Sequence, residues 1–192
     1  MNVQAGFILN SILLGAGLAM DAVSVSVANG LEEPGMSGKK TADIAGTFAF
    51  FQWLMPMLGW FFVTSLLSVF RAVEPFLPFV SFALLLYIGG KLCLEGIKGE
   101  TDENPDSGLG MKALFLQGIA TSIDALSVGF TLASYRAAEA LLSSVLIALT
   151  TFFLCLGALH AGKQAGAVLN RQAKILGGLI LIVIGARIFI AG

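Results

Sequence analysis

Charged residues are scarce in this chain of 192 residues, and their scarcity excludes most soluble folds. Only 12% of the residues are Asp, Glu, Lys or Arg, whereas about a quarter are charged in an ordinary globular domain. The 11 basic and 12 acidic residues give a formal net charge of -1, so no basic surface is available to neutralise a nucleic-acid backbone. We therefore expect no nucleic-acid partner.

Cysteine and histidine are also rare, which excludes the usual sites for soft metals. The two cysteines, Cys93 and Cys155, lie in separate apolar runs and have neither a zinc-type spacing nor that of a disulfide framework. His160 is the single histidine. No pairing of a nucleophile with a base and no catalytic metal cluster is recognisable. The sequence predicts a protein that is not an enzyme and holds no cofactor.

Apolar residues are abundant, at 57% of the chain, and they form six long continuous runs. A helix needs ~20 apolar residues to cross the hydrocarbon core of a bilayer, and barrel strands would alternate instead. We predict an all-α integral membrane protein embedded in the lipid bilayer. Its six transmembrane helices are expected at residues 5–28, 44–69, 74–94, 111–134, 138–160 and 173–191.

The basic residues predict which side of the membrane each loop faces. Eight of the eleven fall on one side, and three fall on the other. The eight are Lys39, Lys40, Lys91, Lys98, Lys112, Lys163, Arg171 and Lys174, and the three are Arg71, Arg136 and Arg187. Because Lys and Arg accumulate in cytoplasmic loops, we expect a multi-pass protein of the bacterial cytoplasmic (inner) membrane with both termini outside the cytoplasm.

An internal repeat divides this single transmembrane domain, residues 1–192. Asp21-Ala22-Val23-Ser24-Val25 recurs as Asp124-Ala125-Leu126-Ser127-Val128, at an offset of 103 positions. A polar linker, residues 96–110, separates repeat one (1–98) from repeat two (111–192). Since each repeat has three helices, the second enters the membrane in the opposite sense. Two inverted-topology three-helix repeats are typical of secondary transporters, whose substrate site lies between the repeats. No oligomeric state follows from the sequence.

The repeated aspartates are the most costly residues in the predicted spans. Each costs about 2.5–3.5 kcal/mol on insertion scales, so both indicate function. Helical spacing predicts one face carrying Gly17, Asp21, Ser24 and Ala28, and another carrying Ala120, Asp124, Ser127 and Thr131. Small residues let helices approach closely, so we expect the two carboxylates to share one site. They would repel each other unless a cation or a proton lay between them.

The other candidate ligands also offer oxygen atoms. Ser24 and Ser127 lie one turn from the aspartates, and Gln52 precedes Pro56 by four residues, where a proline leaves the carbonyl of residue 52 without its helical donor. Oxygen ligands favour hard divalent cations such as manganese, magnesium or calcium. The predicted metal site therefore consists of Asp21, Asp124, Ser24, Ser127 and Gln52.

Several motifs together resemble the bacterial manganese efflux pumps called MntP, within a lysine-exporter-like superfamily. They are Asp21-Ala22, Ser122-Ile123-Asp124-Ala125, Phe51-Gln52-x-x-Met55-Pro56-x-x-Gly59, Gly89-Gly90-Lys91 and Ile175-Leu176-Gly177-Gly178. The resemblance implies export of Mn²⁺ with Asp21 and Asp124 as principal residues. Structural or gating roles are expected for Gly17, Gly30, Pro56 and Gly129. Some relatives carry a glutamate where this chain has Gln52.

These observations together predict a secondary transporter that exports Mn²⁺ from the cytoplasm by alternating access. The two halves would rock about the aspartates, and protons would be the counter-ion because a vacated dicarboxylate site takes up protons. Two alternatives stay open at this point. One is an exporter of an amino acid or another small solute, and the other is a non-transporting membrane subunit in which the aspartates only join helices.

Overall fold

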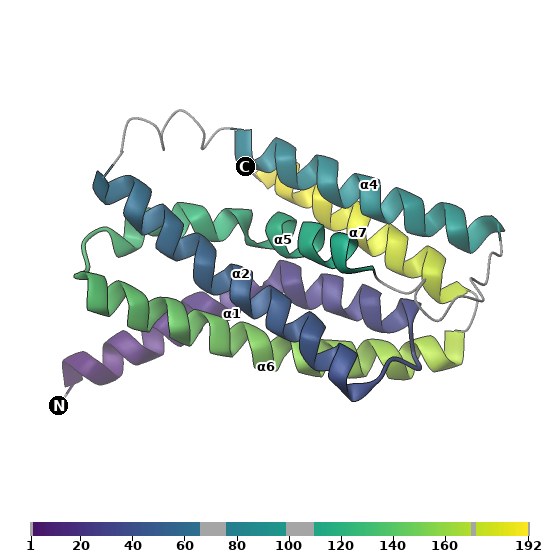
Figure 1. The fold of residues 1–192 in the computed structure, drawn as a ribbon, viewed down its shortest axis with the longest axis horizontal. Helices are drawn as coiled ribbons and strands as arrows, with labels where there is room; N and C mark the ends of the chain where they lie inside the picture. Colours follow the sequence, from purple (N-terminus) through teal and green to yellow (C-terminus); the bar gives the residue numbers. More distant parts are fainter. Residues whose placement is uncertain (1, 66–75, 99–109, 170–171, 192) are drawn as a thin grey trace.

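The computed structural model describes residues 2–65, 76–98, 110–169 and 172–191. Within these ranges every element of the fold is a helix (Figure 1). The helices are α1 (Asn2–Glu32), α2 (Gly38–Ser65), α4 (Leu77–Lys98), α5 (Met111–Leu132), α6 (Ala137–Leu169) and α7 (Gln172–Ala191). The predicted all-helical class is confirmed, and each predicted span overlaps one of these helices, while residues 66–69 and 74–75 of two predicted spans lie outside the described residues. Residues 99–109 of the predicted linker lie outside the described residues.

Three helices of the described chain are long and apolar enough to cross a membrane, and they are α1, α2 and α6. Helices α4, α5 and α7 are 22, 22 and 20 residues long, close to the ~20 residues that a bilayer core requires. Large apolar side chains remain exposed along the bundle, among them Leu13, Phe61, Phe153 and Val183. An outer surface of this kind suits hydrocarbon better than water.

Local capping groups set the helix boundaries. Pro34 and Gly35 end the first helical run, and Ser37 then caps α2 by accepting a hydrogen bond at Oγ from the Lys40 backbone N–H at 3.2 Å. At the start of α6, Glu139 Oε2 accepts a hydrogen bond from the Arg136 backbone N–H at 3.0 Å, as in a capping box. Short turns therefore reverse the chain between α1 and α2 and between α5 and α6.

Helices of opposite halves pack against each other more than helices of the same half do. The main partner of α1 is α6, the main partner of α5 is α2, and α4 packs on α7, whereas α1 makes few contacts with α2. In Figure 1, α1, α4 and α6 run in one direction, and α2, α5 and α7 run in the opposite direction. We call α1 with α6 and α2 with α5 the two crossed pairs.

The two ends of the bundle differ in charge. At one end α1 and α6 finish and α2 and α5 begin (Figure 1). Lys39, Lys40, Lys112 and Lys163 lie near these helix ends, so we call this the basic end. The sequence prediction that these lysines share one side agrees with the fold.

The main core cluster brings together apolar side chains of all six helices, including Val25, Phe48, Leu114 and Leu159.

Candidate cation site

The two repeated aspartates lie on α1 and α5, one in each crossed pair. Their carboxylates are near enough to interact electrostatically. Asp21 is half-buried, and Asp124 is exposed. Asp124 Oδ1 accepts a hydrogen bond from the Ala125 backbone N–H at 2.9 Å. The structure thus places two negative charges in each other's field, an arrangement that a cation or a proton would stabilise.

Gln52 joins the helices that carry these carboxylates. Its side chain on α2 is fully buried, and Nε2 donates to the carbonyl oxygens of Leu18 at 3.0 Å and Thr121 at 3.4 Å. Each of these carbonyls lies three residues before an aspartate, and positions 18 and 121 differ by the same 103 residues as the aspartates. A single amide therefore bridges equivalent points of α1 and α5.

The other end of the same amide has an unused acceptor. Gln52 Oε1 is buried and has no hydrogen-bond partner in the described structure. A buried polar atom without a partner costs about 1–3 kcal/mol of stability. The presence of such an atom here therefore indicates that Gln52 Oε1 binds a ligand. An amide oxygen is a ligand that hard cations accept.

The predicted hydroxyl ligands, Ser24 and Ser127, are both half-buried. Ser24 Oγ donates a hydrogen bond to the Met20 carbonyl of its own helix at 2.9 Å. A hydroxyl that donates in this way keeps lone pairs that a cation can use. Pro56 is buried in α2, and the helix continues through it.

Accessibility changes along the two faces that carry the aspartates. Toward the basic end, Ala28 of α1 and Ala120 of α5 are buried. Toward the opposite end, Gly17 of α1 and Thr131 of α5 are exposed. Both faces are therefore covered on the basic side of the aspartates, whereas on the other side they reach the outer surface of the bundle, where Leu13 and Met20 flank Gly17.

Two buried amides form a feature that the sequence analysis did not identify. Asn29 Nδ2 of α1 donates to Gln117 Oε1 of α5 at 2.8 Å, and Gln117 Nε2 donates to Asn29 Oδ1 at 3.1 Å. Both side chains are almost completely buried, at 0% and 1% exposure. An asparagine inside an apolar helix was the available signal, since it needs a partner in a membrane.

The closest helix contacts in the crossed pairs are made by glycines. A Cβ atom at Gly30 of α1 would lie 2.5 Å from the Leu159 carbonyl oxygen and 2.9 Å from Gly162 Cα of α6. In the other pair, Gly59 of α2 meets Gly129 of α5, where an added Cβ at either glycine would overlap backbone atoms of the other helix. Only glycine permits this approach of two backbones.

The predicted structural glycines differ in their surroundings. Gly30 and Gly129 lie in these close contacts, whereas Gly17 is exposed and a Cβ there would meet nothing within 4 Å. No close contact of helices occurs at Gly17, because the packed face of α1 presents Gly15 and Gly30 instead, and the gating role of Gly17 stays a prediction. The sequence analysis did not identify Gly162. Its signal was the offset of 103 from Gly59.

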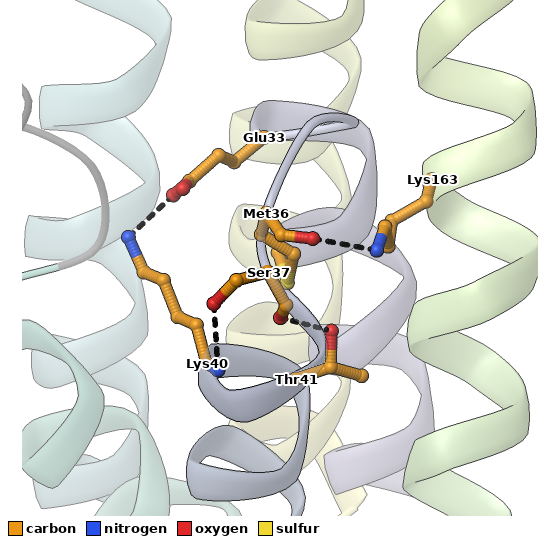
Figure 2. A network of polar contacts seen from close by, with 6 residues as sticks. All are labelled: Glu33, Met36, Ser37, Lys40, Thr41 and Lys163. Atoms are coloured by element: carbon orange, nitrogen blue, oxygen red, sulfur yellow. Dashed lines mark hydrogen bonds and ion pairs between the residues drawn. The ribbon is translucent and has the colours of Figure 1, made fainter.

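The residues that follow Gly59 and Gly162 each donate a hydrogen bond to a turn of the chain. Trp60 Nε1 of α2 donates to the Tyr135 carbonyl, between α5 and α6, at 3.3 Å. Lys163 Nζ of α6 donates to the Met36 carbonyl, between α1 and α2, at 2.7 Å (Figure 2). Positions 60 and 163 again differ by 103, so the same place in each half holds the corresponding turn of the other half.

The turn at the basic end is further held by an ion pair. Figure 2 shows Lys40 of α2 reaching Glu33, with Nζ and Oε2 at 2.5 Å, while the Thr41 hydroxyl donates to the Ser37 carbonyl at 3.0 Å. Lys163 and Lys40 thus both hold the turn between α1 and α2.

Among the described residues, no group of three or more His, Cys, Asp or Glu side chains is arranged to hold a metal ion. A cation at this site would therefore be held by the two carboxylates together with amide, hydroxyl or backbone oxygens. Such a donor set suits a hard divalent ion and leaves positions for water. Ions held in this way exchange more readily than ions in a closed structural site.

A helical bundle with two interacting carboxylates on long apolar helices is typical of a membrane transport protein. A sequence profile described as "Mntp: Putative manganese efflux pump" matches residues 35–189. The "Putative manganese efflux pump MntP" of Ruminiclostridium cellulolyticum is 38% identical over 180 residues, which cover 93% of both chains. The protein of the same description from Methanocorpusculum labreanum is 38% identical over 184 residues, covering 95% of this chain and 96% of its own.

No solved structure matches this chain. The profile and the relatives cover most of its length, so the chain belongs to the MntP family of manganese efflux pumps. Its apolar helices and this membership make it a multi-pass membrane protein. Members of the family are described as transporters rather than enzymes, which confirms the resemblance noted in the sequence and the prediction that the chain is not an enzyme.

Proposed function

We propose that this protein exports Mn²⁺ from the bacterial cytoplasm as a secondary transporter. The observation that carries the proposal is the Gln52 amide, which bridges the backbones of α1 and α5 three residues before Asp21 and Asp124. The two repeated aspartates beyond these bridged points interact electrostatically. The manganese efflux pumps among the relatives supply the choice of metal.

In this proposal Mn²⁺ is the substrate, bound between Asp21 and Asp124. Gln52 Oε1 supplies a neutral oxygen ligand, and the hydroxyls of Ser24 and Ser127 supply others. Two carboxylates balance the charge of one divalent ion, and the few ligands leave it partly hydrated. A site of this kind releases its ion when the surrounding helices move apart.

All six helices are proposed to cross the membrane, with the halves related as inverted repeats. The opposite directions of α1 and α5 and of α2 and α6 support this (Figure 1), as do the equivalent contacts made at positions 60 and 163. The basic end then faces the cytoplasm, in the cytoplasmic (inner) membrane, and both termini lie outside the cytoplasm.

Alternating access is proposed to occur between the crossed pairs. The sequence analysis expected residues 1–98 to rock against residues 111–192, but α1 packs on α6 and α5 packs on α2. Movement of one sequence half against the other would break the glycine contacts of both pairs. Movement of α1–α6 against α2–α5 keeps those glycine contacts, shifts the packing of α2 on α6, and separates Asp21 from Asp124.

Protons are the proposed counter-ion. When Mn²⁺ leaves, two carboxylates remain in each other's field, and binding a proton removes the repulsion. The conformational change then returns the protonated site to the cytoplasmic side. Export of one ion is thereby coupled to uptake of protons without a further cofactor.

The test is Mn²⁺ flux in proteoliposomes that hold the purified protein under an imposed pH gradient. We expect gradient-dependent flux in the native chain and none in Asp21→Asn or Asp124→Asn. Asp43→Asn is the matched control, since Asp43 is exposed near the start of α2. Absence of Mn²⁺ flux in folded native protein would overturn the proposal, and flux of an amino acid in its place would support a solute exporter.

A further inference from the structure

The buried amide pair, Asn29 with Gln117, lies between the basic end and the level of the carboxylates. Asn29 follows Asp21 by eight residues in α1, and Gln117 precedes Asp124 by seven residues in α5. At 1.5 Å per residue these distances are about 12 and 10 Å along the helices. Because α1 and α5 run in opposite directions (Figure 1), both displacements lead toward the basic end.

The pair closes the contact between the two crossed pairs at this level. Its two reciprocal hydrogen bonds use one donor and the acceptor of each amide. Ala28 and Ala120, which continue the two aspartate faces toward the amides, are buried at 0% and 2% exposure. On the other side of the aspartates, Gly17 and Thr131 of the corresponding faces are exposed. In this conformation the carboxylates are therefore shut off from the basic end.

The repeat does not require amides at these positions. An offset of 103 relates Asn29 to Leu132 and Leu14 to Gln117. Leu132 is buried and Leu14 is half-buried, so the opposite end has apolar side chains where the basic end has a hydrogen-bonded pair. The difference between the ends is a difference in chemistry at equivalent places of the fold.

The amide pair also differs from the other contacts of α1. Ser11 of α1 and Ser143 of α6 share a buried hydrogen bond of 3.0 Å within one crossed pair, where glycine contacts hold the backbones together. Asn29 and Gln117 belong to different crossed pairs. Neutral interhelical hydrogen bonds contribute little net stability in membranes, so two of them can break and re-form.

We propose that Asn29 and Gln117 form the gate through which Mn²⁺ reaches Asp21 and Asp124 from the cytoplasmic side. Separation of the crossed pairs parts the two amides and opens the path. It also frees Oδ1 of Asn29 and Oε1 of Gln117, two neutral oxygens that stabilise the partly dehydrated ion as it passes. This inference rests on the proposed function for the identity of the ion and for the orientation.

The first test joins the two gate positions by a disulfide. In a background with Cys93→Ala and Cys155→Ala, we compare Asn29→Cys with Gln117→Cys against Ser11→Cys with Ser143→Cys. Oxidation of the first double variant is expected to lower Mn²⁺ flux in proteoliposomes by more than about tenfold, with recovery on reduction. Oxidation of the second is expected to leave flux within about twofold, because α1 and α6 move together.

Undiminished flux in the oxidised 29–117 variant would overturn the gate. Equal loss in both oxidised variants would overturn it too, since any link would then block the protein. Absence of Mn²⁺ flux in the folded background protein, which has Cys93→Ala and Cys155→Ala but no introduced cysteine, would contradict the proposed function instead of the gate.

The second test needs no transport and no disulfide. Ala120→Cys places a thiol between the gate and Asp124, and a membrane-impermeant thiol reagent is applied from the basic side. We expect Asn29→Ala to raise the labelling rate by at least about tenfold, while Thr131→Cys, exposed on the other side, labels from that side at an unchanged rate. An unchanged rate at position 120 would overturn the gate even if the chain transports another ion.

Discussion

The glycine contacts and the polar centre of this bundle hold helices together in opposite ways. At Gly30 with Gly162 and at Gly59 with Gly129, two backbones touch and no polar side chain is needed. Around Gln52 the helices are joined by hydrogen bonds, two carboxylates repel each other, and one amide oxygen has no partner. The first kind of contact stabilises the fold at little electrostatic cost, and the second costs stability that only a function explains.

The two kinds of contact also lie in different places relative to the proposed movement of the crossed pairs. Glycine contacts lie inside the crossed pairs, whereas Gln52 and the Asn29–Gln117 pair connect one crossed pair to the other. Two closely packed backbones cannot shift slightly without losing their contact. A hydrogen bond, in contrast, can be exchanged for another hydrogen bond or for a bound ion. Substitutions in the two regions should therefore have different effects, on stability in one and on transport in the other.

The largest effect is expected at the repeated carboxylates. Asp21→Asn and Asp124→Asn each remove one of the two charges that balance Mn²⁺, so flux should fall to the background of empty vesicles. Folding should be retained, because an amide of the same shape removes the repulsion between the two carboxylates. Thermal unfolding in detergent and flux are measured on the same preparations. Flux close to that of Asp43→Asn in either variant would contradict a shared dicarboxylate site.

A large effect on stability is expected at the glycine contacts. Gly59→Ala places a Cβ against the Leu126 carbonyl oxygen, and the overpacking should cost about 1–3 kcal/mol. Gly46→Ala in the same helix meets nothing within 4 Å, so it should be neutral or stabilise by about 0.5–1 kcal/mol. The midpoints of thermal unfolding are compared. Equal midpoints would show that the α2–α5 contact is looser than described.

A moderate effect on affinity is expected at Gln52. Gln52→Leu removes the oxygen ligand, and the Mn²⁺ concentration for half-maximal flux should rise about tenfold, as for supporting groups of metal sites. Gln52→Glu adds a negative charge beside two others, so the same concentration should fall and release should slow. The dependence of flux on Mn²⁺ is measured for both. The same half-maximal concentration in all three proteins would remove Gln52 from the site.

The smallest effect is expected at the contacts between helices and turns. Trp60→Phe removes one hydrogen bond to the Tyr135 carbonyl, and Lys163→Met removes one to the Met36 carbonyl. Each should cost about 0.5–1.5 kcal/mol of stability, with Mn²⁺ flux unchanged. Chemical denaturation and flux assays measure the two quantities. A loss of flux without a loss of stability at Lys163 would connect this turn to transport.

Much of the candidate site was predictable because a polar or charged residue is rare within a membrane helix and stands out in an apolar run. Asp21 and Asp124 stand out in apolar runs, and Gln52 precedes a proline, so their residue types alone indicate oxygen ligands. Asn29 gave a similar signal, yet only the fold shows that its partner is Gln117, 88 positions away. Periodicity describes one helix at a time and carries no information on which helix lies opposite.

The sequence by itself determined six apolar helices, the side on which the lysines gather, and a repeated aspartate at an offset of 103. The local pattern suffices for these because helix formation and insertion depend on consecutive residues. Only the tertiary structure decided that α1 packs on α6 and α5 on α2, that Gln52 bridges Leu18 and Thr121, and that Gly17 lies away from any close contact. Those outcomes depend on shape complementarity between segments far apart in the chain, where a missing Cβ at Gly30 or Gly59 selects the partner helix.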